Sequence, residues 1–349
     1  MTANGNHKRR VRARGAKTGE SYTAALRHLS EHPPGDPMPS ATTPARRAAA
    51  DDGAQRPTKQ IRLAVGQVAV PDDPRDRAAL GAAGDALRLL LREAHEGGAR
   101  LVHFPEGATC SPNKRIMSST GALEVGPSDW DRFAWDVVGD ELRATADLCA
   151  ELGIWAVVGS VHPLTPPHRP HNSLYVIDDR GSVVTRYDER MLSNTKLLFM
   201  YTPGSTPVTF EVDGVRFGLS MGMEVHYPEL FLEYERLDVD CVLFSTIGMP
   251  ADEHGVFAAE ARAHAATNSF WVSYAVTAQD SVHAPSGVVS PQGTWVRRGP
   301  QQDGAALVIV DVDDREENLA RPWRRTVRAG IYDEHIVRDD PRSEDRGGF

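Results

Sequence analysis

Short apolar strands alternate with amphipathic helices along residues 61–312, and this alternation constrains the fold more than any other feature of the chain. A strand at 61–65 precedes a helix whose apolar stripe includes Leu87 and Leu91, and a second strand follows at 101–104. Leucines spaced four residues apart lie on one face of a helix, which can then pack on a sheet. The pattern predicts strand–helix–strand units and therefore an α/β protein.

Tight turns interrupt this alternation and predict antiparallel pairs within the same sheets. The turns are Asp179-Arg180-Gly181, Asp213-Gly214 and Gln292-Gly293, each between two apolar strands. Sheets that contain both crossovers and hairpins are mixed, and a two-sheet core with helices on both outer faces accommodates them. The hairpin strands are expected at 174–178 and 183–187, 208–212 and 215–221, and 287–290 and 295–297. Helices near 141–152, 228–235 and 257–268 lead into strands at 154–158, 239–244 and 271–276, and the last strand is 306–312.

The two ends of the chain differ in composition from the middle. Residues 1–58 are rich in Arg, Ala, Pro and Thr and poor in large apolar residues, which predicts a disordered tail. A basic stretch at 8–14 is not followed by an apolar segment, so no secretory signal is predicted. Residues 59–338 form the predicted folded domain, and the charged, glycine-rich segment 339–349 is expected to be loose.

Charge and cysteine content exclude several classes of partner. The chain has 39 Lys and Arg against 48 Asp and Glu, a formal charge of −9, so neither nucleic acid nor an anionic membrane is expected to bind. No apolar run reaches the roughly 18–20 residues of a membrane helix. Cys110, Cys149 and Cys241 fit no zinc or disulfide spacing, which favours the reducing cytoplasm. No metal and no cofactor are expected.

Five segments of the chain, by their residues, order and spacing, together resemble the carbon–nitrogen hydrolase (nitrilase/amidase) superfamily. The segment Leu101–Gly107 reads LVHFPEG, so that a strand ends in Phe-Pro-Glu. The others are Asn172-Ser173-Leu174 with Tyr187 and Met191-Leu192, Gly218–Glu229 ending in Tyr-Pro-Glu, Ala261-Arg262-Ala263 with Asn268, and Gly287–Gly293. The resemblance covers residues 61–333. It implies a four-layer α/β/β/α sandwich with mixed sheets, and a homodimer or larger assembly acting on a small molecule.

The resemblance also implies a cysteine nucleophile, a glutamate base, a lysine and a second glutamate, and here only the base is in its place. Glu106 stands at the position of the base. Gly222 stands where the cysteine is expected, and Glu189 stands where the lysine is expected. The second glutamate is expected near Leu197, which is apolar. Ordinary thiol-dependent hydrolysis is therefore predicted to be absent.

Other side chains near these positions are candidates to compensate. Cys110 lies four residues after Glu106, although a buried loop thiol is the simpler interpretation. Lys196 could reach the site, although exposed loop lysines are common. Met223 and His226 follow Gly222 and are candidate pocket residues, with His226 as a possible proton shuttle.

The replacements put acidic residues where a cation and a thiol are expected. If Glu106 and Glu189 share one pocket, their repulsion should raise one pKa, and such a pair can do acid–base chemistry. Glu224 is a candidate third acid, and His103 is expected to be structural because it lies on the opposite face of the strand from Glu106.

Three functions remain open from the sequence. The first is a repurposed enzyme that uses acid–base chemistry for a cyclisation, condensation or acyl transfer on a small amide- or amine-type molecule. The second is an inactive pseudoenzyme that serves as a binding or assembly subunit. The third is an amidase rescued by Cys110. An open cavity at Glu106 and Glu189 would favour chemistry, whereas a site filled by Met221, Met223 or Leu197 would favour the pseudoenzyme.

Overall fold

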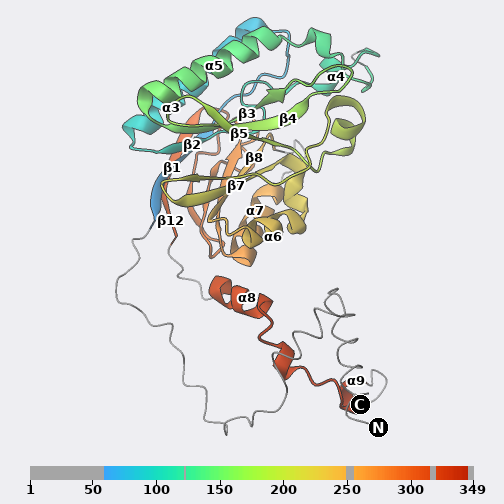
Figure 1. Cartoon of the computed structure of the whole chain (residues 1–349). Helices are drawn as coiled ribbons and strands as arrows, with labels where there is room; N and C mark the ends of the chain where they lie inside the picture. Colours follow the sequence, from blue (N-terminus) through green and yellow to red (C-terminus); the bar gives the residue numbers. More distant parts are fainter. Residues whose placement is uncertain (1–58, 122, 249–254, 315–319, 345–349) are drawn as a thin grey trace, which may run out of the picture. The chain divides into compact units, whose positions relative to one another are not determined.

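The computed structural model describes residues 59–121, 123–248, 255–314 and 320–344 (Figure 1). The expected disordered tail, 1–58, lies outside the described residues, and so does the end of the chain from 345. The expected loose segment, 339–349, also includes described residues, among which a short helix, α9 (Pro341–Glu344), forms.

The first sheet has six strands and is mixed, as the hairpin pattern predicted. Strands β1, β2 and β3 run parallel, and β12, β4 and β5 are antiparallel to their neighbours. In spatial order the strands are β12 (Ala306–Asp313), β1 (Gln60–Gln67), β2 (Leu101–His103), β3 (Trp155–His162), β4 (His171–Ile177) and β5 (Val183–Asp188).

The second sheet also has six strands and three parallel members, β7, β8 and β9. Their antiparallel partners β6, β10 and β11 come from two of the predicted hairpins. In spatial order the strands are β11 (Trp295–Arg298), β10 (Gly287–Val289), β9 (Trp271–Val276), β8 (Cys241–Thr246), β7 (Val215–Met221) and β6 (Thr209–Val212).

Helices cover the outer face of each sheet, which confirms the four-layer α/β/β/α sandwich (Figure 1). The first sheet carries α3 (Arg77–Glu96) and α5 (Trp135–Leu152), and the second carries α6 (Pro228–Arg236) and α7 (Val256–Asn268). Asp76 caps α3 by accepting hydrogen bonds from the backbone N–H groups of Ala78 and Ala79. None of the helices in the described part of the chain has the length and apolar character to cross a membrane.

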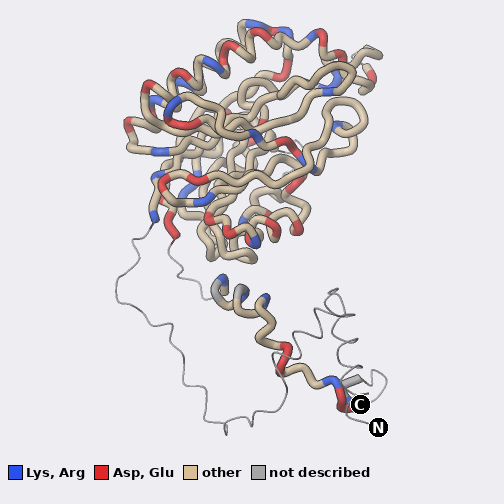
Figure 2. The backbone as a smooth tube through the Cα atoms, in the orientation of Figure 1, with Lys and Arg blue, Asp and Glu red and all other residues tan. Residues whose placement is uncertain are grey.

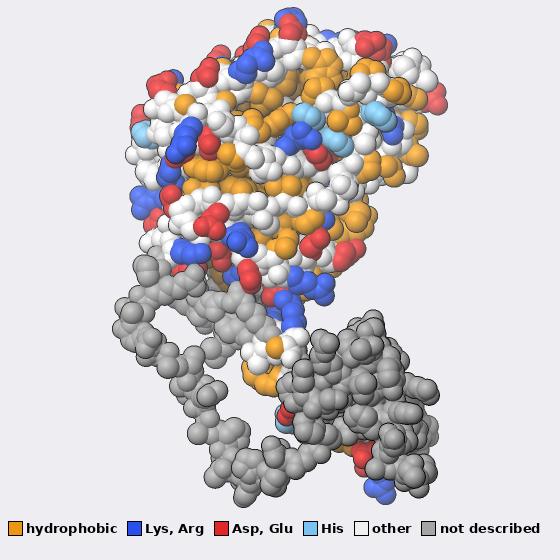
Figure 3. Space-filling view, viewed as in Figure 1, with side chains coloured by type: hydrophobic (Ala, Val, Ile, Leu, Met, Phe, Trp, Pro, Cys, Tyr) orange, Lys and Arg blue, Asp and Glu red, His pale blue; other side chains and the backbone are white. Residues whose placement is uncertain are grey.

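Alternation along the strands builds two kinds of core. On β2, Leu101 faces the other sheet, whereas Val102 faces the helices and packs in the same cluster as Leu87. Phe217 and Leu219 of β7 face Leu101 across the space between the sheets. Acidic and basic residues alternate along the outer helices (Figure 2). The face shown in Figure 3 mixes apolar and charged side chains.

Most of the elements that the sequence pattern missed are short, and a segment of three to five residues cannot show a helical period. The exception is α8, which has nine residues. These elements are α4 (Lys114–Met117), η1 (Trp130–Arg132), the π-helix η2 (Lys196–Met200), η3 (Gly222–His226), α8 (Ala320–Arg328), η4 (Asp333–His335) and α9. Two of them, η2 and η3, form part of the site described next.

Candidate active site

The site lies where strands of both sheets end, and Glu106 is its first member. Glu106 occupies the turn after β2 and is almost fully buried. A glycine on the neighbouring strand makes this turn possible, because a Cβ at Gly159 would lie 2.2 Å from the carbonyl oxygen of Pro105. Such close backbone approach admits only glycine.

His103 braces this turn from inside the sandwich, as its expected structural role requires. The Ser245 hydroxyl donates to the carbonyl of Phe104 at 3.0 Å, so it accepts from Nε2–H of His103 at 2.7 Å. Nδ1 then accepts from the Ser273 hydroxyl at 2.8 Å. Burial lowers the pKa of His103 to about 3, and the ring stays neutral in this hydrogen-bonded chain.

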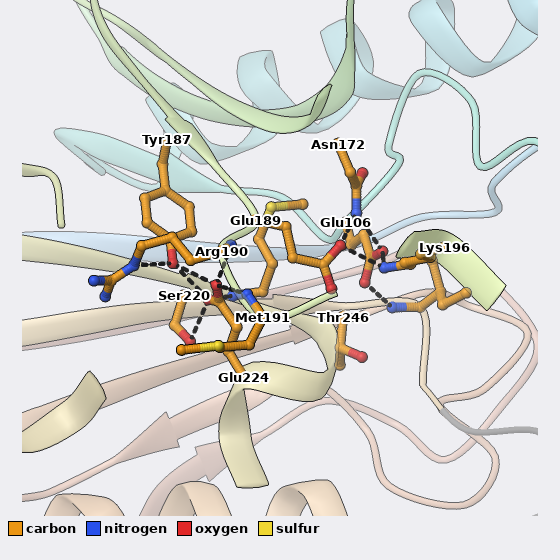
Figure 4. Close-up of polar contacts among 12 residues, drawn as sticks. Glu106, Asn172, Tyr187, Glu189, Arg190, Met191, Lys196, Ser220, Glu224 and Thr246 are labelled. Carbon is orange, nitrogen blue, oxygen red and sulfur yellow. Dashed lines mark hydrogen bonds and ion pairs between the residues drawn. The ribbon is translucent and has the colours of Figure 1, made fainter. Parts of the chain in front are cut away.

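Glu106 and Glu189 share two hydrogen-bond donors (Figure 4). The ammonium of Lys196 lies 2.5 Å from Oε1 of Glu106 and 2.7 Å from Oε2 of Glu189. The Asn172 side-chain amide donates to the same two oxygens, at 2.8 and 2.6 Å. Glu189 directly follows β5, and Asn172 lies on the adjacent strand β4. We call Glu106, Asn172, Glu189 and Lys196 the lysine cluster.

Gly222 lies next to the lysine cluster and directly follows β7. Its backbone is left-handed, with φ of +50°, which favours glycine. A Cβ at this position would lie 3.1 Å from Oε2 of Glu106, 3.1 Å from Oε1 of Glu189 and 3.4 Å from Nζ of Lys196. The position expected to carry a thiol therefore touches every charged group of the cluster.

Two neighbouring residues of the segment after β5 differ in position. Lys196, a candidate pocket residue, reaches the site and joins the lysine cluster. Leu197, near which the second glutamate is expected, has a side chain that is 45% exposed. The segment forms a π-helix, η2, whose turn contains one residue more than an α-helical turn.

Burial and mutual attraction set the protonation of the lysine cluster. Burial raises the pKa of Glu189 to about 8; Lys196 opposes this shift, whereas the charges of Glu106 and Glu224 add to it. Burial lowers the pKa of Lys196, but attraction to Glu106 and Glu189 outweighs burial, so its net pKa is raised. Lys196 therefore stays charged, while Glu189 holds a proton more readily than an ordinary glutamate.

The cluster opens on a cavity of about 720 Å³. Glu106 and Lys196 both line the cavity, together with Tyr201, Ile247 and Thr277. Such a volume accommodates a small organic molecule. Met221 is buried between the sheets, and Met223 packs against the core beside α6 and α7, so neither of these side chains fills the cavity.

The carbon–nitrogen hydrolase family profile matches residues 62–321. The chain belongs to the carbon–nitrogen hydrolase family. It is 25% identical over 277 residues to a Mycobacterium tuberculosis protein (strain H37Rv) described as a hydrolase, which covers 73% of this chain and 90% of that protein. A protein of M. tuberculosis strain CDC 1551, also described as a hydrolase, matches to the same extent.

Solved structures share the fold of this family member. A cysteine-to-alanine point mutant of the amidase from Nesterenkonia AN1, of the nitrilase superfamily, has a TM-score of 0.58 at 21% identity, covering 78% of this chain and 98% of that one. The NitFhit protein of C. elegans has a TM-score of 0.60 at 20% identity, covering 80% of this chain and 66% of that one. Both are similar in fold, which agrees with the nitrilase-type sandwich described above.

Glu224 lies outside the lysine cluster of this family member, at a separate hydrogen-bonding centre (Figure 4). It accepts the Tyr187 hydroxyl at 2.6 Å and the backbone N–H groups of Arg190 and Met221 at 2.6 and 2.9 Å. Burial raises its pKa, whereas these donors lower it. With both oxygens occupied, Glu224 holds η3 and the end of β5 together, and its expected role as a third acid finds no support.

The remaining candidates also lie away from the cluster. His226 pairs with Glu260 at 2.7 Å on a half-buried surface. Cys110 is buried in an apolar cluster behind the cavity, and burial together with the charges of Asp72 and Asp73 raises the pKa of its thiol. The described residues contain no group of three or more His, Cys, Asp and Glu side chains arranged to hold a metal.

Two further residues, Asn172 and Ile247, belong to the site although the sequence pattern did not indicate them. Asn172 begins one of the five matched segments, so its place in that motif was the available signal. Ile247 contributes only its backbone N–H, which donates to Oε2 of Glu106 at 3.3 Å, and no side-chain pattern could have indicated it.

Proposed function

We propose that this carbon–nitrogen hydrolase family member binds a small amide- or amine-type molecule in the cavity and carries out acid–base chemistry on it without a thiol nucleophile. The observation that carries the proposal is that Glu106 and Lys196 line one open cavity side by side. A carboxylate and an ammonium in contact offer a proton acceptor and a hydrogen-bond donor to one ligand.

Each group has a distinct task in such chemistry. Glu106 takes a proton from an N–H or O–H group of the ligand. Lys196, held charged by two carboxylates, stabilises negative charge that develops on a carbonyl oxygen. The ligand itself supplies the attacking group, as in a cyclisation, a condensation or an acyl transfer between two bound molecules. Asn172 and Glu189 keep Lys196 and Glu106 in place.

The absence of a side chain at Gly222 supports a route without a covalent enzyme intermediate. In the Nesterenkonia amidase, the acetamide moiety of fluoroacetamide adds covalently at the active-site cysteine. Loss of a nucleophile reduces the rate of a hydrolase by about 10⁶. Cys110 is a poor substitute, because its thiol is buried away from the cavity and its pKa is raised.

An inactive binding or assembly subunit is the second candidate, and one feature of the cluster favours it. Lys196 occupies one oxygen of each carboxylate, so the charged groups satisfy one another without a ligand. A site of this kind could be kept for stability alone. The two candidates differ in whether a bound molecule is chemically changed.

A ligand screen tests the proposal without assuming a reaction. Amides, ureas, amino acids and their conjugates are tested by thermal shift on the full chain, and every hit is followed by mass spectrometry for a product. A hit should lose its stabilisation in Glu106→Gln and keep it in Glu93→Gln, which changes an exposed glutamate of α3. Binding unaffected by Glu106→Gln would remove the cavity from the proposal, and binding without product would favour the pseudoenzyme.

We also propose that the chain forms a homodimer or larger homo-oligomer in the cytoplasm. The family resemblance supports the assembly, and the free, buried state of all three cysteines is compatible with a reducing compartment. Light scattering coupled to size exclusion gives the mass directly, and a mass of about 38 kDa, that of one chain, contradicts the assembly.

A further inference from the structure

Tyr201 lines the cavity, but its hydroxyl has no role in the lysine cluster. The residue directly follows the π-helix η2, and its backbone N–H donates to the carbonyl oxygen of Lys196 at 2.8 Å. Lys196 and Tyr201 therefore stand one π-helical turn apart, and both line the cavity. π-Helical turns are rare, and they occur frequently at functional sites.

The Tyr201 hydroxyl is almost enclosed by protein, yet it has no hydrogen-bond partner among the described residues. Tyr201 is only 3% exposed. Its oxygen is not among the fully enclosed polar atoms that lack a partner, so part of it remains open. Since Tyr201 lines the cavity, this opening faces the cavity. A buried hydroxyl without a protein partner indicates that a bound molecule or water completes its hydrogen bonding.

Aromatic packing fixes the ring of Tyr201. The centroid of the Trp130 ring lies 5.5 Å from that of Tyr201, and the Trp130 indole donates to the carbonyl oxygen of Met200 at 3.1 Å. Ring and backbone are therefore both held by Trp130. The hydroxyl is in place before a ligand arrives, as is required of a donor that stabilises developing charge.

The hydroxyl also keeps its proton. Burial raises the pKa of Tyr201; the charge of Lys196 opposes this shift, and those of Glu106 and Glu189 add to it. A neutral phenol can donate a hydrogen bond. The cavity therefore offers two donors, the ammonium of Lys196 and the hydroxyl of Tyr201, and one strong acceptor, Glu106.

We infer that Tyr201 is a further catalytic residue of the cavity, whose hydroxyl donates a hydrogen bond to the same ligand carbonyl oxygen as the ammonium of Lys196. The phenol keeps its proton, and Glu106 takes the proton of the attacking N–H or O–H group. The ligand is then an amide or another carbonyl compound, because an amine without a carbonyl offers Tyr201 no acceptor. The inference rests on the proposed function, since it requires a small molecule in the cavity.

A matched pair of probes and a matched pair of variants test the inference. Butyramide and butylamine have the same carbon chain, but only butyramide has a carbonyl oxygen. In calorimetry on the full chain, Tyr201→Phe should weaken butyramide binding about three- to tenfold and leave butylamine binding unchanged. Tyr332→Phe, which removes an exposed hydroxyl outside the cavity lining, should change neither.

The infrared carbonyl stretch of bound, isotope-labelled butyramide gives a readout that a merely structural role of Tyr201 would not move. Two donors to the carbonyl oxygen lower this frequency, so the complex with Tyr201→Phe should absorb at a higher frequency than the wild-type complex. The melting temperature of the free variant should equal that of Tyr332→Phe, because the Tyr201 hydroxyl has no partner to lose among the described residues.

The outcomes separate this inference from the proposed function. Equal affinity and equal frequency in wild type and Tyr201→Phe overturn the inference alone if Glu106→Gln still abolishes binding. A wild-type chain that binds butylamine but not butyramide also overturns the inference alone, and one that binds neither overturns the proposed function with it. A melting temperature of Tyr201→Phe well below that of Tyr332→Phe would reveal an internal partner of the hydroxyl and overturn the inference as well.

Discussion

Two groups of buried carboxylates lie next to each other in this molecule, and they differ in how many hydrogen bonds they receive. Glu224 is fully buried, and both of its oxygens accept hydrogen bonds from backbone and hydroxyl donors. Glu189 is equally buried, yet one of its oxygens has no donor among the described residues. Burial alone therefore does not distinguish the two acids. A carboxylate whose oxygens all accept hydrogen bonds holds structure, whereas Glu189 keeps one oxygen without a donor and shares Lys196 with Glu106, which lines the cavity.

The largest effect is expected from removal of Glu224, whose two oxygens both accept hydrogen bonds. Glu224→Ala should lower the free energy of unfolding by about 3–5 kcal/mol, because the N–H groups of Arg190 and Met221 and the Tyr187 hydroxyl lose their buried acceptor. Urea unfolding of the full chain measures the loss. Glu229→Ala, an exposed residue in the first turn of α6, is the control. A loss below about 1 kcal/mol would contradict the structural role given to Glu224.

A smaller effect is expected from removal of the positive charge of Lys196 from the lysine cluster. Lys196→Met keeps the length of the side chain but leaves Glu106 and Glu189 without a shared ammonium. We expect a loss of about 2–4 kcal/mol at pH 8 and a smaller loss at pH 5, where the carboxyls can accept protons. Unfolding at the two pH values measures both. A loss that does not depend on pH would mean that Lys196 acts through packing.

The raised pKa of Glu189 predicts how the stability of the folded chain depends on pH. The pKa of Glu189 is raised to about 8 in the folded chain, above its ordinary 4.5. The folded state therefore binds more protons between these values, and this contribution to stability is full below pH 4.5 and is lost as pH rises through about 8. Glu189→Gln should remove that decline, because an amide does not titrate in this range. Unchanged pH dependence in the variant would place the titration on another group.

The smallest effect is expected from the thiol nearest the site. Cys110→Ser changes a side chain that does not line the cavity. Ligand binding by calorimetry should stay within about twofold of the wild-type value, since differences of a few tenths of a kcal/mol are typical away from a site. A loss of binding or turnover in Cys110→Ser would revive the amidase rescued by Cys110.

Much of the fold could be predicted because its signals repeat along the chain. The hairpin turns at Asp213-Gly214 and Gln292-Gly293, and the apolar stripe that includes Leu87, define strands and helices of ordinary length. The sandwich also follows from mixed sheets with helices on both sides. Short elements such as η2 and η3 have no period to detect, so they were missed.

The sequence could predict only those site residues that lie close to the end of a strand, because the strand determines where they are. Glu106 lies in the turn after β2 and Gly222 directly follows β7, and a Cβ at Gly222 would lie 3.1 Å from Oε2 of Glu106. Lys196 was a candidate pocket residue, but its pairing with both Glu106 and Glu189 depends on the irregular segment between β5 and η2, which has no period to detect. The role of Glu224 depends on how many donors surround it, which no pattern of residue types encodes.

The most direct test of the central claim is intact-protein mass spectrometry during incubation with a ligand from the screen. We predict that no acyl group becomes attached to Cys110, Cys149 or Cys241 at any time. Any turnover should persist after iodoacetamide treatment and disappear in Glu106→Gln. A thioester trapped on any of the three cysteines during turnover would contradict it.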